Sequence, residues 1–212
     1  MNYACILFDW DGCLADTLDI WIEAYTRSLE LRGINAGKSA VVQELFNDWE
    51  GPERFGVQDV GVFELEILST MEERVPTAVF NSGALRALNE LHKCGKTTAV
   101  LTGSRRSFVE PVIIREGVES MVDLLVCWED VTHPKPHPEA VERALATLAV
   151  PRERAIMVGD STRDIQMGSN AGTATVLYFP NKNRSYYGLS QLERCRPDFV
   201  IRDFNDLLNL VV

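Results

Sequence analysis

The sequence predicts an α/β fold, in which a doubly wound, Rossmann-like parallel sheet carries a small inserted α-helical cap domain. From residue 82 onward, short apolar runs alternate with segments of helical periodicity, which is typical of a parallel sheet covered on both faces. Between the first apolar run and residue 82 the pattern is helical only. We therefore expect a catalytic core of residues 1–15 and 82–212 and a cap of residues 16–81.

The first strand and the cap come first along the chain. Residues 4–8, ACILF, form a short apolar run of the kind found in buried parallel strands. A single apolar stripe over residues 18–29 then predicts an amphipathic helix, with Asp16 as its N-cap and Gly33 as its C-cap. Two more helices are expected at 41–49 and 60–71. Glycine and proline predict a loop over residues 47–56.

The remaining elements belong to the core. Helices are expected at 83–94, 104–116, 138–149 and 162–171 and from residue 204 onward. Strands are expected at 97–102, 124–127, 155–158, 173–178 and 199–200. In such sheets the ligand site lies beyond the carboxyl ends of the strands.

Composition limits the partners and the compartment. The net charge of -10 disfavours nucleic acid, and no apolar run reaches the ~18 residues of a membrane span. The five cysteines include no CxxC pair, and we expect free thiols in a cytoplasmic protein. The expected partner is a small phosphorylated metabolite, and the expected state is a monomer or a homodimer.

Polar residues follow four of the predicted strands and should meet in one crevice. These residues are Asp9 and Asp11; Thr102, Gly103 and Ser104; Lys135, between His133 and His137; and Asp160, Ser161 and Asp164. Converging carboxylates suit Mg²⁺, which prefers oxygen ligands. A lysine, a hydroxyl and the free amides of a helix beginning near Ser104 suit a phosphoryl group.

The paired aspartates suggest two catalytic roles. Side chains at i and i+2 of an extended chain share a face, so Asp9 and Asp11 should lie together. One would attack phosphorus and form an aspartyl-phosphate. The other would protonate the leaving oxygen and later activate water. The residues alone do not say which aspartate takes which role.

Four segments resemble the motifs of the haloacid dehalogenase-like superfamily. They are DWDGCLADT, AVLTGS, KPHPE and VGDSTRDIQMGSNAG, in the family's order and spanning residues 8–172. The helical insertion resembles the cap of the phosphoglycolate phosphatase and β-phosphoglucomutase branch. Two departures, Cys13 for a usual Thr and Gly168 for a usual Ala, touch no catalytic atom.

The resemblance implies a role for each matching residue. Asp9 would be the nucleophile and a metal ligand, and Asp11 the general acid/base, whose backbone carbonyl also binds the metal. Thr102, with Gly103, and Lys135 would bind phosphate. Asp160 would bind Mg²⁺ directly, and Asp164, supported by Ser161, would hold the metal's waters or the lysine.

Other candidates receive simpler interpretations. Asp11 argues for transfer from a phosphate ester, because the dehalogenases of the superfamily lack an acid there. Trp10 and Cys13 should pack in the core. Arg54 could bind a substrate carboxylate, and a solvated surface arginine is at least as good an interpretation. We do not count His133 or His137 as catalytic.

The leading hypothesis is an Mg²⁺-dependent phosphomonoester hydrolase of the phosphoglycolate phosphatase type that acts on a small organic phosphate. A phosphosugar mutase shares every core residue, and pyrophosphate and nucleotide monophosphates also remain open as substrates. A receiver-like phospho-aspartate switch uses similar side chains in a different order. A catalytically silent relative is a further class, disfavoured because all the required side chains are present.

Overall fold

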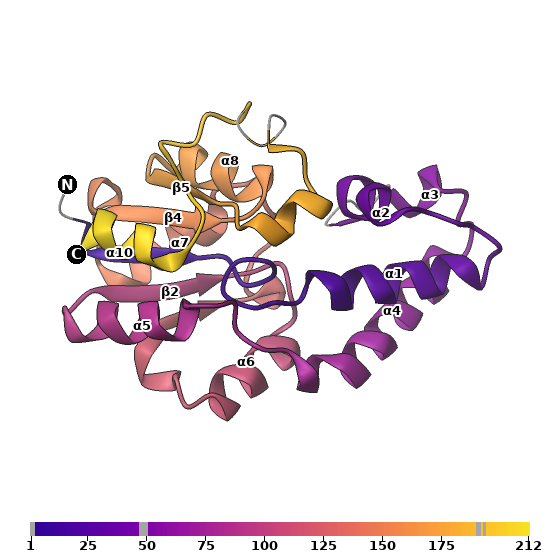
Figure 1. The fold of residues 1–212 in the computed structure, drawn as a ribbon, viewed down its shortest axis with the longest axis horizontal. Coiled ribbons are helices and arrows are strands. Elements are labelled where there is room, and N and C mark those ends of the chain that lie inside the picture. Colours follow the sequence, from indigo (N-terminus) through magenta and orange to yellow (C-terminus); the bar gives the residue numbers. More distant parts are fainter. Residues whose placement is uncertain (1–2, 47–50, 190–191, 193) are drawn as a thin grey trace.

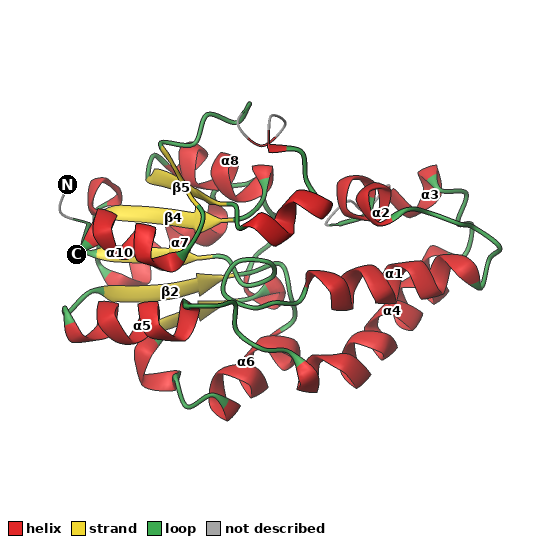
Figure 2. Ribbon diagram, viewed as in Figure 1, coloured by secondary structure: helices red, strands yellow, loops and turns green. Residues whose placement is uncertain are grey.

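The protein is an α/β structure built on one six-stranded parallel sheet (Figures 1 and 2). The computed structural model describes residues 3–46, 51–189, 192 and 194–212. The strand order is β3-β2-β1-β4-β5-β6, and each neighbouring pair is parallel. The strands are β1 (Cys5–Phe8), β2 (Thr97–Leu101), β3 (Leu124–Val126), β4 (Ala155–Gly159), β5 (Ala174–Tyr178) and β6 (Phe199–Ile201). The predicted fold class is confirmed.

Helices cover both faces of the sheet. The core helices are α5 (Ala84–Lys93), α6 (Arg106–Arg115), α7 (Glu139–Leu148), α8 (Thr162–Ala171) and α10 (Phe204–Val211). Alternate side chains of β1 enter two separate apolar clusters. Ile6 and Phe8 pack with α5, α6 and α10, and Cys5 and Leu7 pack with α7 and α8. This two-sided burial explains why β1 is apolar at every position.

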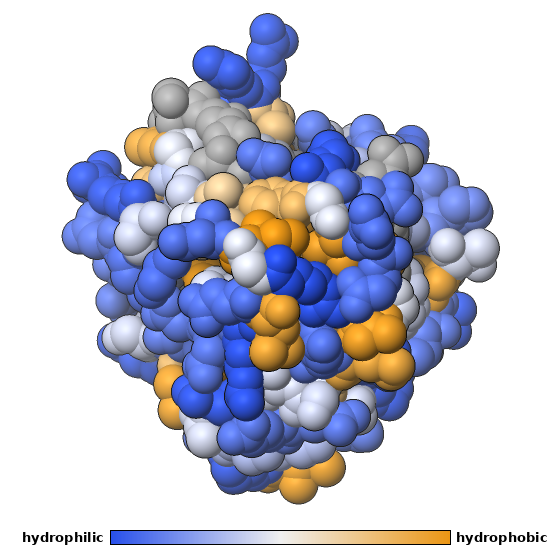
Figure 3. Space-filling view, turned by 90° about the vertical axis from the view of Figure 1, so that its right-hand side faces the viewer, coloured by the Kyte–Doolittle hydropathy of each residue, from blue (hydrophilic) through white to orange (hydrophobic). Residues whose placement is uncertain are grey.

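Between β1 and α5 the described residues form four α-helices that lie beyond the carboxyl ends of the strands (Figure 1). They are α1 (Leu18–Glu30), α2 (Lys38–Glu44), α3 (Gly51–Arg54) and α4 (Val60–Arg74). Helices α1 and α4 lie side by side, with Leu29 and Phe63 fully buried. Figure 3 views the molecule from this end, where hydrophobic patches are surrounded by hydrophilic residues. We refer to residues 16–81 as the cap.

The two chain segments that join core and cap run side by side. The amide of Asp16 donates to the carbonyl of Val79 at 2.8 Å, and the amide of Asn81 donates to Leu14 at 2.7 Å. The ammonium of Lys182 pairs with Asp16 at 2.6 Å and also contacts the amide oxygen of Asn81. Lys182 therefore joins the segment that leaves the core at Asp16 to the segment that returns to it at Asn81.

Short 3-10 helices complete the described chain. They are η1 (Val75–Thr77), η2 (Glu119–Met121), η3 (Trp128–Asp130), η4 (Arg152–Arg154) and η5 (Asn181–Ser185). Among the described residues, no helix is both long and apolar enough to cross a membrane.

The structure corrects several predicted boundaries. Helix α1 has Thr17, not Asp16, as its N-cap, because the Asp16 carboxylate pairs with Lys182. The same helix has Leu31, not Gly33, as its C-cap, and Gly33 occupies the following turn at a φ of 69°.

Two further predictions fall near the uncertain part of the cap. The predicted loop over 47–56 contains the short helix α3. Residues 47–50, which hold the end of the predicted 41–49 helix, lie outside the described residues.

Candidate active site

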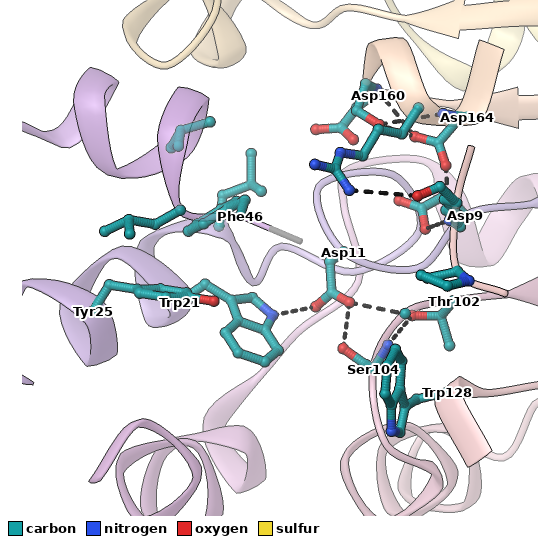
Figure 4. A pocket seen from close by; sticks show the side chains of 18 of the residues that line it. Asp9, Asp11, Trp21, Tyr25, Phe46, Thr102, Ser104, Trp128, Asp160 and Asp164 are labelled. Carbon is teal, nitrogen blue, oxygen red and sulfur yellow. Dashed lines mark hydrogen bonds and ion pairs between the residues drawn. The ribbon is translucent and has the colours of Figure 1, made fainter. Parts of the chain in front are cut away.

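A cavity of about 300 Å³ lies where the carboxyl ends of the strands face the cap (Figure 4). The core lines it with the predicted polar residues, which are Asp9, Asp11, Thr102, Gly103, Lys135, Asp160, Ser161 and Asp164. The cap lines it mainly with apolar and aromatic side chains. All the core residues predicted from the four strand ends therefore converge on one cavity.

The turn after β1 presents the paired aspartates. The strand ends at Phe8, so Asp9 and Asp11 lie in the following turn and not within the strand itself. Gly12 adopts a φ of 78°, and a Cβ atom there would lie 2.3 Å from Oδ2 of Asp160. Only glycine allows this close approach. Trp10 is buried and packs edge-on against Phe80, with ring centroids 5.3 Å apart.

Three buried carboxylates form the centre of the site. Oxygen atoms of Asp9, Asp160 and Asp164 lie within 4.8 Å of one another. Burial and the neighbouring carboxylates raise the pKa of both Asp9 and Asp160. Carboxylates held this close require a compensating positive charge or a proton.

Lys135 supplies part of that charge. Its Nζ lies 2.5 Å from Oδ1 of Asp9 and 2.7 Å from Oδ1 of Asp164, and its side chain is only 11% exposed. Burial disfavours the charged ammonium, but Asp164 and Asp9 outweigh it and keep the pKa of Lys135 above its usual value. The lysine is therefore held as a cation against the acid cluster.

The first turn of α8 fixes Asp164. Ser161 is the N-cap of this helix, and its hydroxyl donates to Oδ2 of Asp164 at 2.5 Å while its amide donates at 3.1 Å. A Cβ atom on Gly159 would lie 2.3 Å from the Cβ of Asp164. The glycine thus leaves room for the carboxylate beside the strand end.

The donor set fits Mg²⁺. Three carboxylates supply the hard oxygen ligands that this ion prefers. Nδ2 of Asn183 donates to Oδ2 of Asp160 at 3.4 Å, and Oδ1 of Asn183 is buried without a hydrogen-bond partner. An ordered water of a bound ion would satisfy such an oxygen. A direct metal contact of the Asp11 backbone carbonyl stays a prediction.

Asp11 occupies a different environment from Asp9. Its Oδ1 accepts from the hydroxyl of Thr17 at 2.7 Å and from Nε1 of Trp21 at 2.8 Å. Its Oδ2 accepts from the hydroxyls of Ser104 at 2.6 Å and Thr102 at 3.3 Å. Figure 4 shows Asp11 between Trp21 on one side and Ser104 and Thr102 on the other. Donors from both the cap and the core therefore orient this carboxylate.

The predicted helix after Thr102 starts later than expected. It begins at Arg106, with Arg105 as its N-cap, because the Ser104 side chain turns toward Asp11. The amides near Gly103 therefore belong to a loop. The amide of Ser104 already donates to the hydroxyl of Thr102 at 2.9 Å.

Some candidates lie away from the chemistry. Arg54 is exposed, donates to the carbonyl of Glu44 at 3.2 Å and does not line the cavity, so the structure gives no support to its predicted substrate contact. His133 reaches the rim, where its Nδ1 lies 2.8 Å from Glu139. His137 stacks on His133 at 4.4 Å. Cys13 is fully buried, and burial raises the pKa of its thiol.

Several site residues were missed from the sequence. Trp21 binds Asp11, and Asn183 and the hydroxyl of Tyr187 bind Asp160. Trp21 looks like an ordinary member of an apolar helical stripe. Asn183 and Tyr187 follow β5 without a recognisable motif. Ser104 was expected in the crevice as part of a helix start, and its hydroxyl contact with Asp11 was not predicted.

The chain is similar to proteins of one known family. A family model described as haloacid dehalogenase-like hydrolase matches residues 6–178. A protein named pyrophosphatase PpaX from Bacillus cereus (strain G9842) is 31% identical over 219 aligned positions, which cover 100% of this chain and 97% of that protein. The PpaX protein of Bacillus mycoides is 30% identical, with 100% and 98% coverage.

Solved structures share the fold. A structure titled as a predicted phosphoglycolate phosphatase from Haemophilus somnus 129pt aligns with a TM-score of 0.85 and 20% identity, covering 99% of this chain and 98% of that one. A haloacid dehalogenase-like hydrolase from Bacteroides fragilis aligns with a TM-score of 0.83 and 22% identity, covering 97% and 100%. At these identities the likeness shows the fold alone.

Proposed function

The chain belongs to the haloacid dehalogenase-like hydrolase family, and we propose that it is an Mg²⁺-dependent phosphatase that hydrolyses a small organic phosphomonoester through an aspartyl-phosphate. One observation carries the proposal. Asp9, Asp160 and Asp164 form a buried acid cluster that holds Lys135 at the carboxyl ends of the strands. Such a cluster favours a divalent cation, and the lysine favours a phosphate beside it.

Asp9 is the proposed nucleophile. A carboxylate oxygen of Asp9 attacks phosphorus, and the bond between phosphorus and the ester oxygen breaks. When bound, Mg²⁺ supplies positive charge that stabilises the carboxylates and the phosphoryl oxygens. Lys135 adds a second positive charge, since its ammonium already lies 2.5 Å from Asp9.

Asp11 is the proposed general acid and base. In the first step it protonates the departing alkoxide, which leaves as an alcohol. In the second step the Asp11 carboxylate takes a proton from water, and the resulting hydroxide attacks phosphorus and releases Asp9. Its position near Asp9, and the contacts from Thr17, Trp21, Thr102 and Ser104 that orient its carboxyl group, support this assignment.

The phosphosugar mutase is less well supported than the hydrolase. A sugar presents several hydroxyl groups that need hydrogen-bond partners, whereas the cap lines the cavity mainly with apolar side chains. The receiver-like switch loses its support, because a hydrolase family model matches most of the chain. Pyrophosphate stays in the substrate panel because relatives carry that name.

The proposal extends to the partner and the compartment. The partner is a small phosphorylated metabolite, and a cytoplasmic location is consistent with five free cysteines.

Turnover of a generic ester tests the proposal. Purified protein should release phosphate from 4-nitrophenyl phosphate with Mg²⁺, and a chelator should stop the release. D9N should lower kcat by at least about 10³-fold, because the amide cannot act as the nucleophile. D59N, which changes an exposed aspartate of the cap, is the matched control and should retain activity. Wild-type turnover by a folded D9N protein would refute the assignment of the nucleophile.

A further inference from the structure

The wall that the cap contributes to the cavity is apolar and aromatic. It includes Trp21, Tyr25, Phe46 and Phe63, and among the described cap residues that line the cavity Glu64 alone is charged. Residues 47–50, NDWE, add neither a lysine nor an arginine to the sequence of the cap. The described cap wall thus offers no cation to a substrate.

Three of these rings are placed to meet a ligand. Trp21, Tyr25 and Phe46 are half-buried, whereas Phe63 behind them is fully buried. The ring centroids of Tyr25 and Phe46 lie 5.4 Å apart, and those of Trp21 and Phe46 lie 6.5 Å apart. Figure 4 shows the three rings across the cavity from Asp9 and Asp160. Their uncovered surface gains free energy when an apolar group displaces water.

Three described lysine or arginine side chains line the cavity, and none of them belongs to the cap. Lys135 is held by Asp9 and Asp164 at the phosphate end. Arg105 is exposed, and Arg163, which donates to the carbonyl of Lys135 at 3.4 Å, is near enough to act electrostatically on the hydroxyl of Tyr25. An anionic group placed against the rings would be desolvated by them and repelled by Glu64, whereas a neutral ring would not.

We propose that the alcohol released by this enzyme carries an uncharged aromatic group, which stacks against Trp21, Tyr25 and Phe46 while the phosphate binds at the acid cluster. The proposal rests on the proposed phosphatase function and specifies its leaving group. It distinguishes a preference for a neutral aromatic leaving group from a preference for one that carries a carboxylate or a second phosphate. The rings select the substrate, and the core supplies the proposed nucleophile, the acid/base and the phosphate-binding lysine.

Three esters with similar primary alcohols test the proposal. Ethyl phosphate, 2-phenylethyl phosphate and 2-phosphoglycolate differ in carrying no substituent, a neutral ring or a carboxylate. We expect kcat/KM for 2-phenylethyl phosphate to exceed that for ethyl phosphate by roughly ten- to a hundredfold, the gain from burying one phenyl ring. It should also exceed the values for 2-phosphoglycolate and for pyrophosphate.

A matched pair of variants locates the effect. F46L removes one ring from the wall and should reduce the preference for 2-phenylethyl phosphate over ethyl phosphate by about threefold or more. F55L makes the same change at a cap residue that does not line the cavity, and it should leave the preference unchanged. If F46L and F55L showed the same preference for 2-phenylethyl phosphate over ethyl phosphate, the cap wall would not be the site that binds the aromatic group.

The outcomes separate this inference from the function on which it rests. Turnover of ethyl phosphate with a preference for 2-phosphoglycolate or pyrophosphate, or with no preference, overturns the inference and leaves the phosphatase standing. If no ester is turned over, the proposed phosphatase function is wrong. The aromatic site is then tested by calorimetry, which measures how tightly non-hydrolysable phosphonates bind. Tighter binding of 2-phenylethylphosphonate than of ethylphosphonate then supports the aromatic site, and equal binding overturns it.

Discussion

Nε1 of Trp21 donates a hydrogen bond to Oδ1 of Asp11 at 2.8 Å, which joins the first cap helix to the proposed acid/base. Thr17 donates to the same oxygen at 2.7 Å. The orientation of Asp11 therefore depends on the placement of α1 as well as on the core. A cap residue can in this way affect the chemical step in addition to substrate choice.

Replacing Trp21 should separate these two effects. W21F keeps an aromatic ring and removes the donor to Asp11. We expect kcat for ethyl phosphate to fall by about tenfold, the value of one hydrogen bond to a charged group, and to fall less for 4-nitrophenyl phosphate, whose leaving group needs little protonation. Y25F, which leaves the Asp11 contacts intact, serves as the control. Equal losses with both esters in W21F would contradict an orienting role toward the general acid.

Asn183 should tune the metal site through Asp160. Its side chain is fully buried and donates to Oδ2 of Asp160 at 3.4 Å. N183L removes the donor at similar volume, and we expect Mg²⁺ to bind about tenfold more weakly by calorimetry, as is usual for residues that orient metal ligands. N181L alters an exposed asparagine of the same turn and should bind Mg²⁺ normally. Unchanged Mg²⁺ affinity in N183L would remove Asn183 from the site.

Gly168 is a packing requirement of this sequence. A Cβ atom there would lie 2.8 Å from both the Cβ of Met157 and the Cγ2 of Thr175. G168A should therefore lower the free energy of unfolding by ~1–3 kcal/mol through overpacking. G61A, in open space on α4, should instead raise it by ~0.5–1 kcal/mol. Urea denaturation measures both, and a stabilised G168A protein would show that the neighbouring elements move apart easily.

The cysteines should differ strongly in reactivity. Burial raises the pKa of Cys5 and of Cys127 to about 12, whereas Cys94 is exposed. At pH 8 a thiol reagent should label Cys94 rapidly and the buried cysteines slowly, because the thiolate is the reacting form. C94S should remove the fastest phase and leave the slower labelling of the half-buried Cys195, and C127S should retain the fastest phase. A fast phase that survives when both Cys94 and the half-buried Cys195 are replaced by serine would indicate that a buried cysteine becomes accessible.

The fold and the core of the site could be predicted because they depend on local patterns. The apolar run before Asp9 and the glycine after Asp11 reflect requirements within a few residues. The convergence of Lys135 with Asp9 follows from the rule that parallel strands end at one edge. The family assignment drawn from these motifs is confirmed by the match over residues 6–178.

The remaining contacts depend on distances between elements that no local pattern encodes. The indole of Trp21 reaches Asp11 because α1 leaves the core at a particular angle, and Asn183 reaches Asp160 because the chain turns back after β5. The start of α6 was placed too early for a similar reason. Ser104 reads as a helix start, and its bond to a distant carboxylate holds it in the loop.

Lys182 joins the two segments that connect the core to the cap, and their closeness affects how the protein could change over evolution. Because the insertion leaves and re-enters the core at neighbouring positions, the sheet needs only a short connection there. Insertions with adjacent ends are tolerated well. A helical unit of different length could thus replace residues 16–81 without altering strand order or the acid cluster. The catalytic residues of the core can thus stay the same while a different inserted unit changes the substrate specificity.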